Sequence, residues 1–523
     1  MHFRTRLLGL LVIASGALSA CQQGGGADTQ APDSLSGETT APGNTAPTAP
    51  TTPGTGTGTG TVTTPPTTTP TPTPTPAPAV KYTREWVVAP TGSDSSAGSA
   101  AAPFRTIGKA LSVVSPGERI TVKAGTYAER ISIEDSVKAG TQSAPIRLQG
   151  EGMPRIVPGN SSSSMVAVRK PYWQLDGFDV DAQGTNKLGV VFYDATTTGS
   201  VLSGSKVHNG KAGAAVTTFQ YATGVTIENN EIYDYWIDGQ DSHGVLVQYS
   251  SKDITVRGNK IHNVSGDSVQ CIGPEDYSTL PPADGVLIEG NDMSANYENG
   301  FDIKTCYNVT IRKNVIHDFT QTGGCSGVVH MSAANVLIED NDFFNVGKAI
   351  AIGGNHYGPV PNKVVVRKNR IRDVIKDSTR EGNAIRLENS ESAEVVNNTI
   401  IRVGNAAVML GGGTGGATSN LKVYNNILQG AEALHVGSMA PGLSAGNNLY
   451  VSSAKFYVSG SGTLGFSAWT GLGKDVGSVE GALELSTDGL FTPGANAVDR
   501  GRNLGLAYCG AAPDLGAVET GCP

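Results

Sequence analysis

The middle of the chain contains polar residues whose types suit chemistry on a carbohydrate. Asp302 and Lys304 stand two residues apart in the run GFDIK; Asp267 and Gln270 precede them, and His330 follows. A Lys or His with a pKa near the working pH can act as a general base. Carboxylates are ligands that Ca²⁺ prefers. These types suit β-elimination on an acidic polysaccharide, in which a base removes the proton at C5 while a cation neutralises the adjoining carboxylate.

The roles within this group remain open at the level of sequence. Lys304 and His330 are rival candidates for the base, because Asp302 on the same strand would keep Lys304 charged unless calcium occupied the carboxylate. Alternatively, Asp302 with Glu388 or Asp267 could form the carboxylate pair of a glycoside hydrolase, and only their separation would decide this. The same surface could also bind a glycan without turnover.

These residues lie in a stretch from Gly224 to Asn448 that repeats one short pattern, as in GVTIENNEIYD at Gly224 and NVTIRKNVIHD at Asn308. The repeat asparagines are Asn230, Asn259, Asn291, Asn314, Asn341, Asn369, Asn398, Asn426 and Asn448. Their spacing runs from 22 residues (Asn426 to Asn448) to 32 residues (Asn259 to Asn291). A period of this size predicts an array of stacked units and not a single globular core.

The spacing inside each unit predicts strands. Apolar residues recur two apart, as at Val225 and Ile227, and a second alternating run follows soon after, as in GVLVQ at Gly244. Two or three short strands per unit leave no room for a helix. They predict an all-β fold, a parallel β-helix, and it should be right-handed by the usual rule for parallel connections. The repeat Asn would occupy one corner of every coil, tolerate left-handed backbone there and hydrogen-bond to the Asn of the next coil.

Charges two residues before the repeat Asn alternate in sign through successive coils. They are Glu228, Arg257, Glu289, Arg312, Glu339 and Arg367. In stacked parallel strands this column predicts an outward ionic ladder, so these arginines are not expected to form a substrate-binding patch.

Alternation along the second strand of each coil predicts which residues face outward. The inward positions are Val245, Val247, Val269, Cys271, Phe301, Ile303, Ile385 and Leu387, and the outward ones are Leu246, Gln248, Ser268, Gln270, Asp302, Lys304, Arg386 and Glu388, joined by His330. We expect a flat face on which an extended polymer lies, bound by Gln270, Gln248 and Glu388. Glu275 falls in the 32-residue interval, whose extra loop should overhang this face.

The segment from Glu85 to Ile133 contains a Gly-Ser-Asp turn, the run PFRTI and then GTY. It resembles the opening of secreted right-handed β-helix proteins of the pectate-lyase-like superfamily, including the family-nine pectate lyases. Its one helical pattern, with Ile107, Ala110 and Leu111 on one face, should cap the open N-terminal end of the stack. The tail runs FTPGANAVDRG and PDLGAVETG resemble a C-terminal closure, in which Asp499 and Asp514 would be structural.

The resemblance to family-nine lyases extends to the candidate site. Those enzymes hold calcium with acids on two successive coils, which DSV at Asp267 and ENGFD from Glu298 to Asp302 resemble in part. This implies Asp267, Glu298 and Asp302 as calcium ligands. The base motif of that family, Asn-Gly-Phe-Lys, has SGVV in its expected coil, and its nearest counterpart, NAIR from Asn383 to Arg386, lies two coils beyond. Arg386 is therefore expected to bind or neutralise a substrate carboxylate.

The N-terminal part predicts export. Residues 1–20 carry two arginines, an apolar run and small residues, and the ending LSAC resembles the lipobox of bacterial lipoproteins, with Cys21 as the lipid-modified residue. Residues 21–80 form a disordered Thr/Pro/Gly-rich linker. The β-helix domain should then span 81–523, with an N-terminal cap at 82–125 and a C-terminal cap from about 450. We expect a lipid-anchored monomer of the bacterial cell envelope, at the outer membrane or the cell surface, that contacts the membrane only through its lipid.

The net charge and the cysteine content limit the classes of partner molecule and the disulfides that are expected. The formal net charge is −8, whereas nucleic-acid binders are usually basic, so no nucleic-acid partner is expected. In an exported protein Cys509 and Cys522 should pair, and one more disulfide could form among Cys271, Cys306 and Cys325. Taken together, the sequence predicts a surface-tethered, calcium-assisted polysaccharide lyase, with a non-catalytic glycan-binding or adhesive module and a glycoside hydrolase as alternatives.

Overall fold

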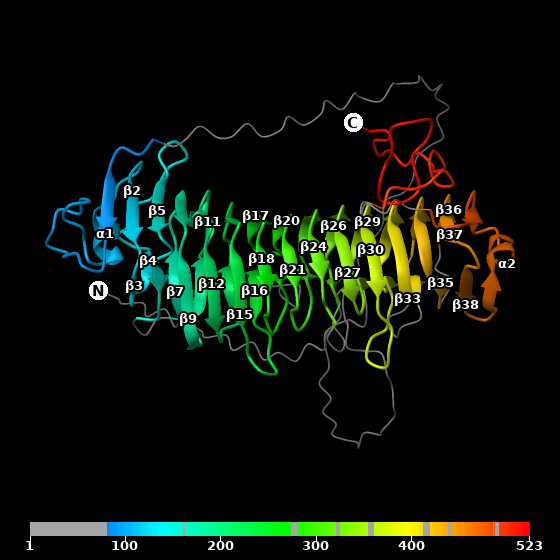
Figure 1. Cartoon of the computed structure of the whole chain (residues 1–523), viewed down its shortest axis with the longest axis horizontal. Coiled ribbons are helices and arrows are strands. Elements are labelled where there is room, and N and C mark those ends of the chain that lie inside the picture. The colour runs from blue at the N-terminus through cyan, green and yellow to red at the C-terminus, as the bar shows by residue number, and fades with distance from the viewer. Residues whose placement is uncertain are drawn as a thin grey trace, which may run out of the picture. The chain divides into compact units, whose positions relative to one another are not determined.

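The computed structural model describes residues 81–159, 163–273, 281–320, 325–353, 360–411, 419–437, 442–484, 486 and 491–522. The predicted signal segment, Cys21, the linker and Glu275 lie outside these residues. Within them the chain winds through strands that pair in parallel with the equivalent strand of the next coil (Figure 1). The predicted fold class, an all-β parallel β-helix, is therefore confirmed.

The first face of the β-helix is a sheet of 15 strands. Its strands are β1 Glu85–Val88, β2 Arg119–Lys123, β5 Ile146–Glu151, β8 Trp173–Asp176, β11 Val201–Ser203, β14 Thr226–Glu228, β17 Lys252–Arg257, β20 Asp284–Glu289, β23 Tyr307–Arg312, β26 Ala334–Glu339, β29 Asn362–Arg367, β32 Glu391–Val396, β34 Lys422–Tyr424, β36 Ser444–Gly446 and β40 Asp475–Val476.

The second sheet has 26 strands, whose pairings divide it into two further faces. Face 2 contains β3 Thr126–Tyr127, β6 Arg155–Ile156, β9 Asp179–Thr185, β12 Lys206–Gly210, β15 Glu231–Tyr235, β18 Lys260–His262, β21 Asp292–Ser294, β24 Val315–His317, β27 Asp342–Val346, β30 Arg370–Val374, β37 Leu449–Val451 and β41 Val479–Gly481. Face 3 contains β4 Ile131–Ile133, β7 Ser164–Val168, β10 Leu188–Phe192, β13 Ala214–Thr218, β16 His243–Val247, β19 Val269–Cys271, β22 Phe301–Lys304, β25 Gly327–His330, β28 Ile350–Gly353, β31 Ile385–Glu388 and β38 Lys455–Val458. Two long strands, β33 Thr399–Leu410 and β35 Ile427–Val436, contribute to both faces.

The core lies inside the coils and is built from stacked apolar columns. Ile227, Val256, Ile288, Ile311 and Ile338 stand in register on successive strands of the first face, and all five are fully buried. Each column keeps one side chain per coil, because a strand that slipped by one residue would turn its apolar set to the outside. This fixed register also determines which polar residues of face 3 become neighbours.

The predicted asparagine ladder is present along one corner. The side-chain amide of Asn314 donates to the Oδ1 of Asn341 at 2.9 Å, and its Oδ1 accepts from the backbone N–H of Asn291 at 2.9 Å. One detail of the prediction was wrong, because the left-handed residue is the one that precedes each repeat Asn. Lys313 and Asp340, for example, have φ of 56°. This turn leaves the Asn itself free to point inward and bond along the stack.

The ionic ladder is confirmed as well. The six predicted residues pair in register, and the arginines bridge to the preceding glutamates, as in Arg312 to Glu289 at 2.8 Å and Arg367 to Glu339 at 2.6 Å. Because these guanidinium groups face carboxylates on the first face, they are not available to bind substrate on face 3.

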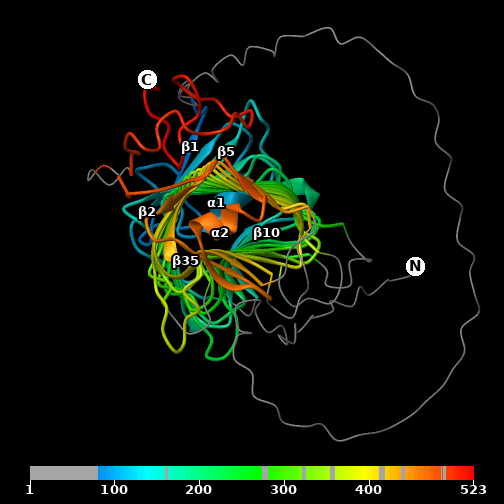
Figure 2. The ribbon, with the colours of Figure 1, turned by 90° about the vertical axis from the view of Figure 1, so that its right-hand side faces the viewer.

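A helix covers each end of the stack (Figures 1 and 2). Helix α1, Ile107–Val113, begins at Thr106, whose side chain accepts from the backbone N–H of Lys109, and it buries Ile107, Ala110 and Leu111 as predicted. At the other end lie β39 Gly462–Gly465, which pairs antiparallel with β38, and helix α2, Phe466–Thr470, with Trp469 fully buried. The short 3-10 helix η1, Ala195–Thr197, lies in a loop between β10 and β11.

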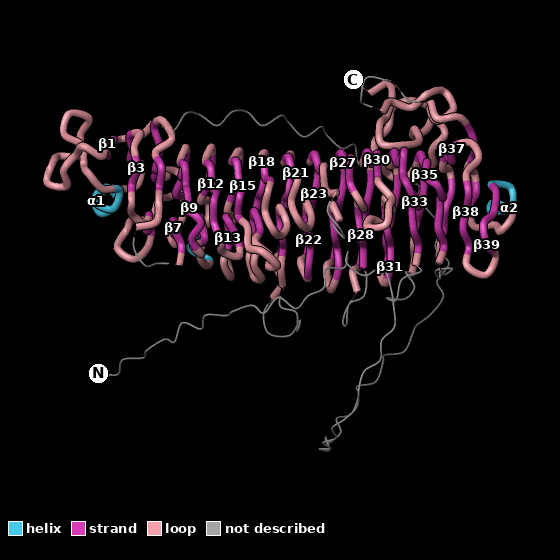
Figure 3. The backbone as a smooth tube through the Cα atoms, turned by 60° about the horizontal axis from the view of Figure 1, so that its bottom comes forward, coloured by secondary structure: helices cyan, strands magenta, loops and turns pink. Residues whose placement is uncertain are grey.

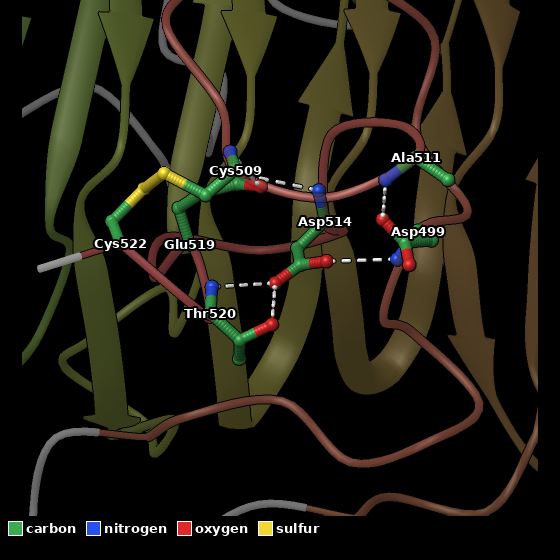
Figure 4. The surroundings of a disulfide bond; sticks show 7 residues. All are labelled: Asp499, Cys509, Ala511, Asp514, Glu519, Thr520 and Cys522. Carbon is green, nitrogen blue, oxygen red and sulfur yellow. Dashed lines mark hydrogen bonds between the residues drawn. A yellow bond between two sulfur atoms is a disulfide. The ribbon is translucent and has the colours of Figure 1, made fainter.

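The tail that the sequence assigned to the C-terminal closure does not cover the end. It folds back on earlier coils, where the Asn425 side chain accepts from the N–H of Arg502 at 2.8 Å and the side chain of Asn397 donates to the carbonyl of Asp514 at 3.1 Å. Asp514 accepts from the N–H groups of Asp499 and Thr520, so the structural reading of these acids agrees with their contacts (Figure 4).

Two disulfides are defined among the described cysteines. Cys509 pairs with Cys522 as predicted (Figure 4), and the additional bond joins Cys271 to Cys306 across 35 residues. In the part of the chain that the structure describes, none of the helices has the length and apolarity needed to cross a membrane.

Candidate functional site

The candidate site lies on face 3, where β16, β19, β22 and β25 stack. Figure 3 labels β13, β22, β28 and β31 of this face. Gln270 stands in register with Asp302, and Lys304 stands in register with His330. The predicted inward positions of these strands are all fully buried, so the alternation was read correctly. The polar residues of three coils therefore do share one outward surface.

Asp302 joins the two candidate bases. Its Oδ2 lies 3.1 Å from the Nζ of Lys304, and its Oδ1 lies 2.9 Å from the Nε2 of His330. The exposed fraction of the side chain is 6% for Asp302, 12% for Lys304 and 3% for His330. The expectation of a flat, open face was therefore wrong, because these outward side chains are covered by their surroundings.

Neighbouring charges determine the protonation states of Asp302 and Lys304. Burial alone would raise the pKa of Asp302, but the charges of Lys304 and His330 outweigh it and hold that pKa well below its usual range. Burial alone would lower the pKa of Lys304, but Asp302 and Asp267 outweigh it and raise that pKa above its ordinary value of 10.5. Lys304 is thus a fixed ammonium, and as it stands it is a poor general base.

Further acids come from the loops that lead into these strands. Burial raises the pKa of Glu298, and the charges of Asp267, Asp241 and Asp302 raise it further, to about 9. Burial and the charge of Asp267 also raise the pKa of Asp241. We call Asp241, Asp267, Glu298, Asp302, Lys304 and His330 the Asp302 cluster. Its carboxylates outnumber its cations, which gives the surface a negative potential.

Asp267 is buried and forms hydrogen bonds through both its carboxylate and its backbone N–H. It is fully buried, its two carboxylate oxygens accept from Gln270 at 2.9 Å and from Asn299 at 2.6 Å, and its backbone N–H donates to the Nδ1 of His243 at 3.0 Å. Gln270, predicted to bind substrate, is itself only 3% exposed. It therefore acts on Asp267 and has little surface left for a ligand.

The predicted calcium ligands, Asp267, Glu298 and Asp302, offer the oxygen donors that calcium prefers. However, Lys304 and His330 engage both oxygens of Asp302, and protein amides engage both of Asp267. Among the residues that the structure describes, no three His, Cys, Asp or Glu side chains stand together as a metal-binding group. As they stand, these side chains do not fit a chelated ion.

Arg386 and Glu388 belong to a second cluster, which the sequence reading had merged with the first. The Oε1 of Glu381 accepts from Lys348 at 2.7 Å and from Arg386 at 2.8 Å, and Arg386 also bonds to Glu388 at 2.6 Å. We call Lys348, Glu381, Arg386 and Glu388 the Glu381 cluster. Burial and the nearby charge of Arg386 lower the pKa of Lys348. Sequence reasoning missed Lys348 and Glu381, because both precede their strands and fall outside the alternation.

The register separates the two clusters. Asp302 is followed along its column by Val328, Ala351 and then Arg386, three coils away. At about 4.8 Å per coil this is roughly 14 Å. Arg386 therefore cannot act on the same sugar as Lys304, although a polymer lying along face 3 could reach both. Gln248 stands on the other side of the Asp302 cluster, half-buried at the end of β16.

Comparisons with known proteins agree with this architecture. A model for the right handed beta helix region matches residues 188–362 and 243–428, and a family described only as a protein of unknown function (DUF1565) matches residues 90–137. The chain is 24% identical over 381 residues to the uncharacterized protein YwoF of Bacillus subtilis, covering 65% of this chain and 79% of that protein. It is 22% identical over 314 residues to pectate lyase PEL9 of Emericella nidulans, covering 58% of this chain and 72% of that protein.

Among solved structures, the PL6 family alginate lyase AlyGC superposes with a TM-score of 0.50 at 15% identity, covering 79% of this chain and 55% of that one. This likeness concerns the fold. Together with the family model, it supports the predicted architecture, a right-handed parallel β-helix.

Proposed function

We propose that this pectate-lyase-like β-helix is a carbohydrate-active protein, a polysaccharide lyase that cleaves an acidic glycan by β-elimination at the Asp302 cluster. The observation that carries the proposal is that one buried carboxylate, Asp302, contacts a lysine and a histidine on adjacent coils of the same face. A sequence relative that is named a pectate lyase supports the reaction class.

The contacts favour separate roles for the two candidate bases. Lys304, which Asp302 and Asp267 keep charged, would pair with the carboxylate of a uronate and stabilise the negative charge that develops there. His330 would be the base, because its imidazole contacts Asp302 from the adjacent coil and a neutral imidazole can accept a proton, whereas Lys304 is kept charged. The C5 proton would pass to His330, the electron pair would form the C4–C5 double bond, and the glycosidic oxygen would leave C4 and take a proton from water.

Calcium remains a prediction for this site. An ion held by Asp267, Glu298 and Asp302 would supply positive charge opposite the substrate carboxylate. The present contacts of Asp267 and Asp302 would first have to break. We therefore assign no step to calcium, and the experiment below includes it as a separate condition.

A second candidate function, glycoside hydrolysis, rests on Glu298. Because burial and three neighbouring carboxylates raise its pKa to about 9, its carboxyl group is neutral near pH 7 and could protonate a leaving oxygen. An ionised partner such as Asp267 or Asp241 would complete the pair. The two reactions have different products, since hydrolysis creates a reducing end without a double bond.

The test measures ultraviolet absorbance and reducing ends released from a panel of acidic polysaccharides, with calcium or with a chelator, using the full chain. We expect absorbance to rise for wild type and to fall by at least about a hundredfold in Lys304→Ala and His330→Ala. Matched controls are Lys260→Ala and His317→Ala, which lie on face 2 away from the cluster. Reducing ends without absorbance would replace the lyase by the hydrolase.

Retention of a polymer with neither product would instead favour the glycan-binding or adhesive module. The proposed place of action is the cell envelope, where a lipid on Cys21 would hold the domain. These parts of the proposal are independent, since the anchor could be correct while the reaction is wrong.

A further inference from the structure

A half-buried tryptophan and an exposed tyrosine form an aromatic pair at one corner of the coils, beside the Asp302 cluster. Trp236 and Tyr297 meet edge to face, with ring centroids 6.0 Å apart and an interplanar angle of 77°. Tyr297 is 47% exposed, the largest value among the exposed aromatic residues of the described chain. An aromatic pair with an exposed ring commonly marks a binding surface.

Three loops lead into β16, β19 and β22, namely residues 236–242, 263–268 and 295–300. Trp236 lies in the first of these loops and Tyr297 in the third. We call these loops the acidic corner. They are tied to one another, because the Oγ of Ser265 accepts from the N–H of Ile237 at 3.0 Å and the side chain of Asn296 accepts from the N–H of Val264 at 2.9 Å. The aromatic pair is therefore held by loops that hydrogen-bond to one another, and Tyr297 directly precedes Glu298 in the chain.

The exposed charge of the acidic corner is the carboxylate of Asp238, because Glu298 is neutral near pH 7 and Asp267 is fully buried beside His243. Its loops contain Asp238, Asp241, Asp267 and Glu298 and no Lys, Arg or His. The Nε1 of Trp236 donates to the Oδ1 of Asp238 at 2.9 Å, so one of these carboxylates stands beside the ring. A uronate would meet repulsion from Asp238 here, whereas the hydroxyl groups of a neutral sugar could donate to that carboxylate while its C–H face rested on the rings.

We propose that Trp236 and Tyr297 form a subsite for an uncharged pyranose ring, next to the sugar that the Asp302 cluster acts on. This deepens the proposed function and rests on it for the position of the uronate at Lys304. The substrate class that follows is a mixed glycan, in which a neutral sugar adjoins a uronate, and not a polymer of uronates alone.

Tryptophan fluorescence tests the subsite without reference to cleavage. The chain has four tryptophans, of which Trp86, Trp173 and Trp469 are buried, so quenching by acrylamide reports mainly on Trp236. The probes are a hyaluronan tetrasaccharide, which alternates uronate and neutral sugar, and a tetragalacturonate, which is uronate throughout. We expect the alternating probe to protect Trp236 at concentrations about tenfold lower than the all-uronate probe, a difference of one favourable contact.

Tyr297→Ala should weaken protection by the alternating probe about tenfold, and Trp236→Phe should remove most of the quenchable signal. Tyr307→Ala is the matched control, since Tyr307 is also exposed but lies on β23 of the first face. Equal protection by both probes, or no protection by either, overturns the inference, and so does binding that Tyr297→Ala leaves unchanged. If cleavage fails while protection depends on Tyr297, the proposed function falls and the subsite stands.

Discussion

Replacing Lys304 by methionine tests whether the Asp302 cluster is as closed to water as its contacts indicate. The substitution keeps most of the side-chain volume and removes the charge that lies 3.1 Å from Asp302. With an effective dielectric constant of about 20, that pair is worth roughly 5 kcal/mol of attraction. Breaking a buried pair typically destabilises a protein by about 3 to 5 kcal/mol, because the remaining charge stays buried.

Thermal unfolding at neutral pH provides the assay. A domain of about 440 residues has an unfolding entropy near 0.9 kcal/mol/K, so a loss of about 4 kcal/mol should lower Tm by roughly 4 °C. Because stacked coils can unfold in parts, hydrogen exchange of the β22 and β25 amides should be measured as well. The exchange should be faster in the variant, and faster there than on distant coils.

The depressed pKa of Asp302 predicts how the difference in Tm between Lys304→Met and wild type changes with pH. In wild type the pKa of Asp302 is depressed, so the stability from its pairing is present above the unfolded pKa and is lost as the pH falls through the folded pKa. In Lys304→Met that pKa should rise, so the difference in Tm between variant and wild type should be large at pH 7 and shrink toward pH 4. The second substitution Asp302→Asn, added to Lys304→Met, should recover part of the loss by removing the uncompensated charge.

The matched control is Lys260→Met, an exposed lysine on face 2, which should change the free energy of unfolding by less than about 0.5 kcal/mol. A Tm of Lys304→Met within about 1 °C of wild type at pH 7 would refute the reasoning, since it would mean that water already screens the pair. Failure of Asp302→Asn to recover any stability would contradict the assigned partner.

Four further predictions concern the ladder, the acidic corner, the disulfide and the anchor. Asn314→Ala should lower the free energy of unfolding by about 3 to 6 kcal/mol in urea titrations, because several buried backbone and side-chain groups lose their partners; a loss below about 1 kcal/mol would contradict the ladder. Glu298 has a raised pKa, so its favourable contribution is full below its unfolded pKa and is lost as the pH rises toward about 9; Glu298→Gln should therefore raise the free energy of unfolding at pH 8 by up to about 4 kcal/mol relative to wild type, with a higher Tm, and leave both nearly unchanged at pH 5. Replacing both Cys271 and Cys306 by Ser should destabilise the protein by about 4 kcal/mol, as closure of a 35-residue loop implies, whereas equal stability of the reduced and oxidised wild type would argue against the bond. Cys21→Ser should move the protein from the membrane fraction to the soluble fraction of fractionated bacteria, and retention in the membrane would exclude the lipid anchor.

The fold was largely predictable, because each unit of a repeat protein contacts only the units next to it, so that a local sequence pattern determines the architecture. The alternation that placed Val269 and Ile303 inside and the spacing that aligned Asn291 with Asn314 depend only on neighbouring strands. The position of the left-handed residue was missed by one, since Lys313 takes that conformation although its type does not favour it.

The candidate site was predictable only in part, because the alternation along a strand does not show how loops from different coils pack against each other. Alternation correctly turned Asp302 and Lys304 outward, but it could not show that their side chains are largely buried. Nor could it find Lys348 and Glu381, which meet from loops of different coils at 2.7 Å. The sequence placed Arg386 two coils beyond the expected base coil, but it could not show that Arg386 bonds to Glu381 and Glu388, because Glu381 falls outside the alternation.

The three-coil interval between Asp302 and Arg386 makes the distance between the two clusters a whole number of identical steps. Insertion of one coil between β25 and Lys348 would leave both clusters and both end caps intact and increase their separation by about 4.8 Å, close to the length of one sugar. Gain of a single repeat could therefore change which monosaccharides of a chain are bound together, without changing the residues of either cluster. In this architecture, the length of glycan that spans the two clusters would change by one fixed step for each repeat that is gained.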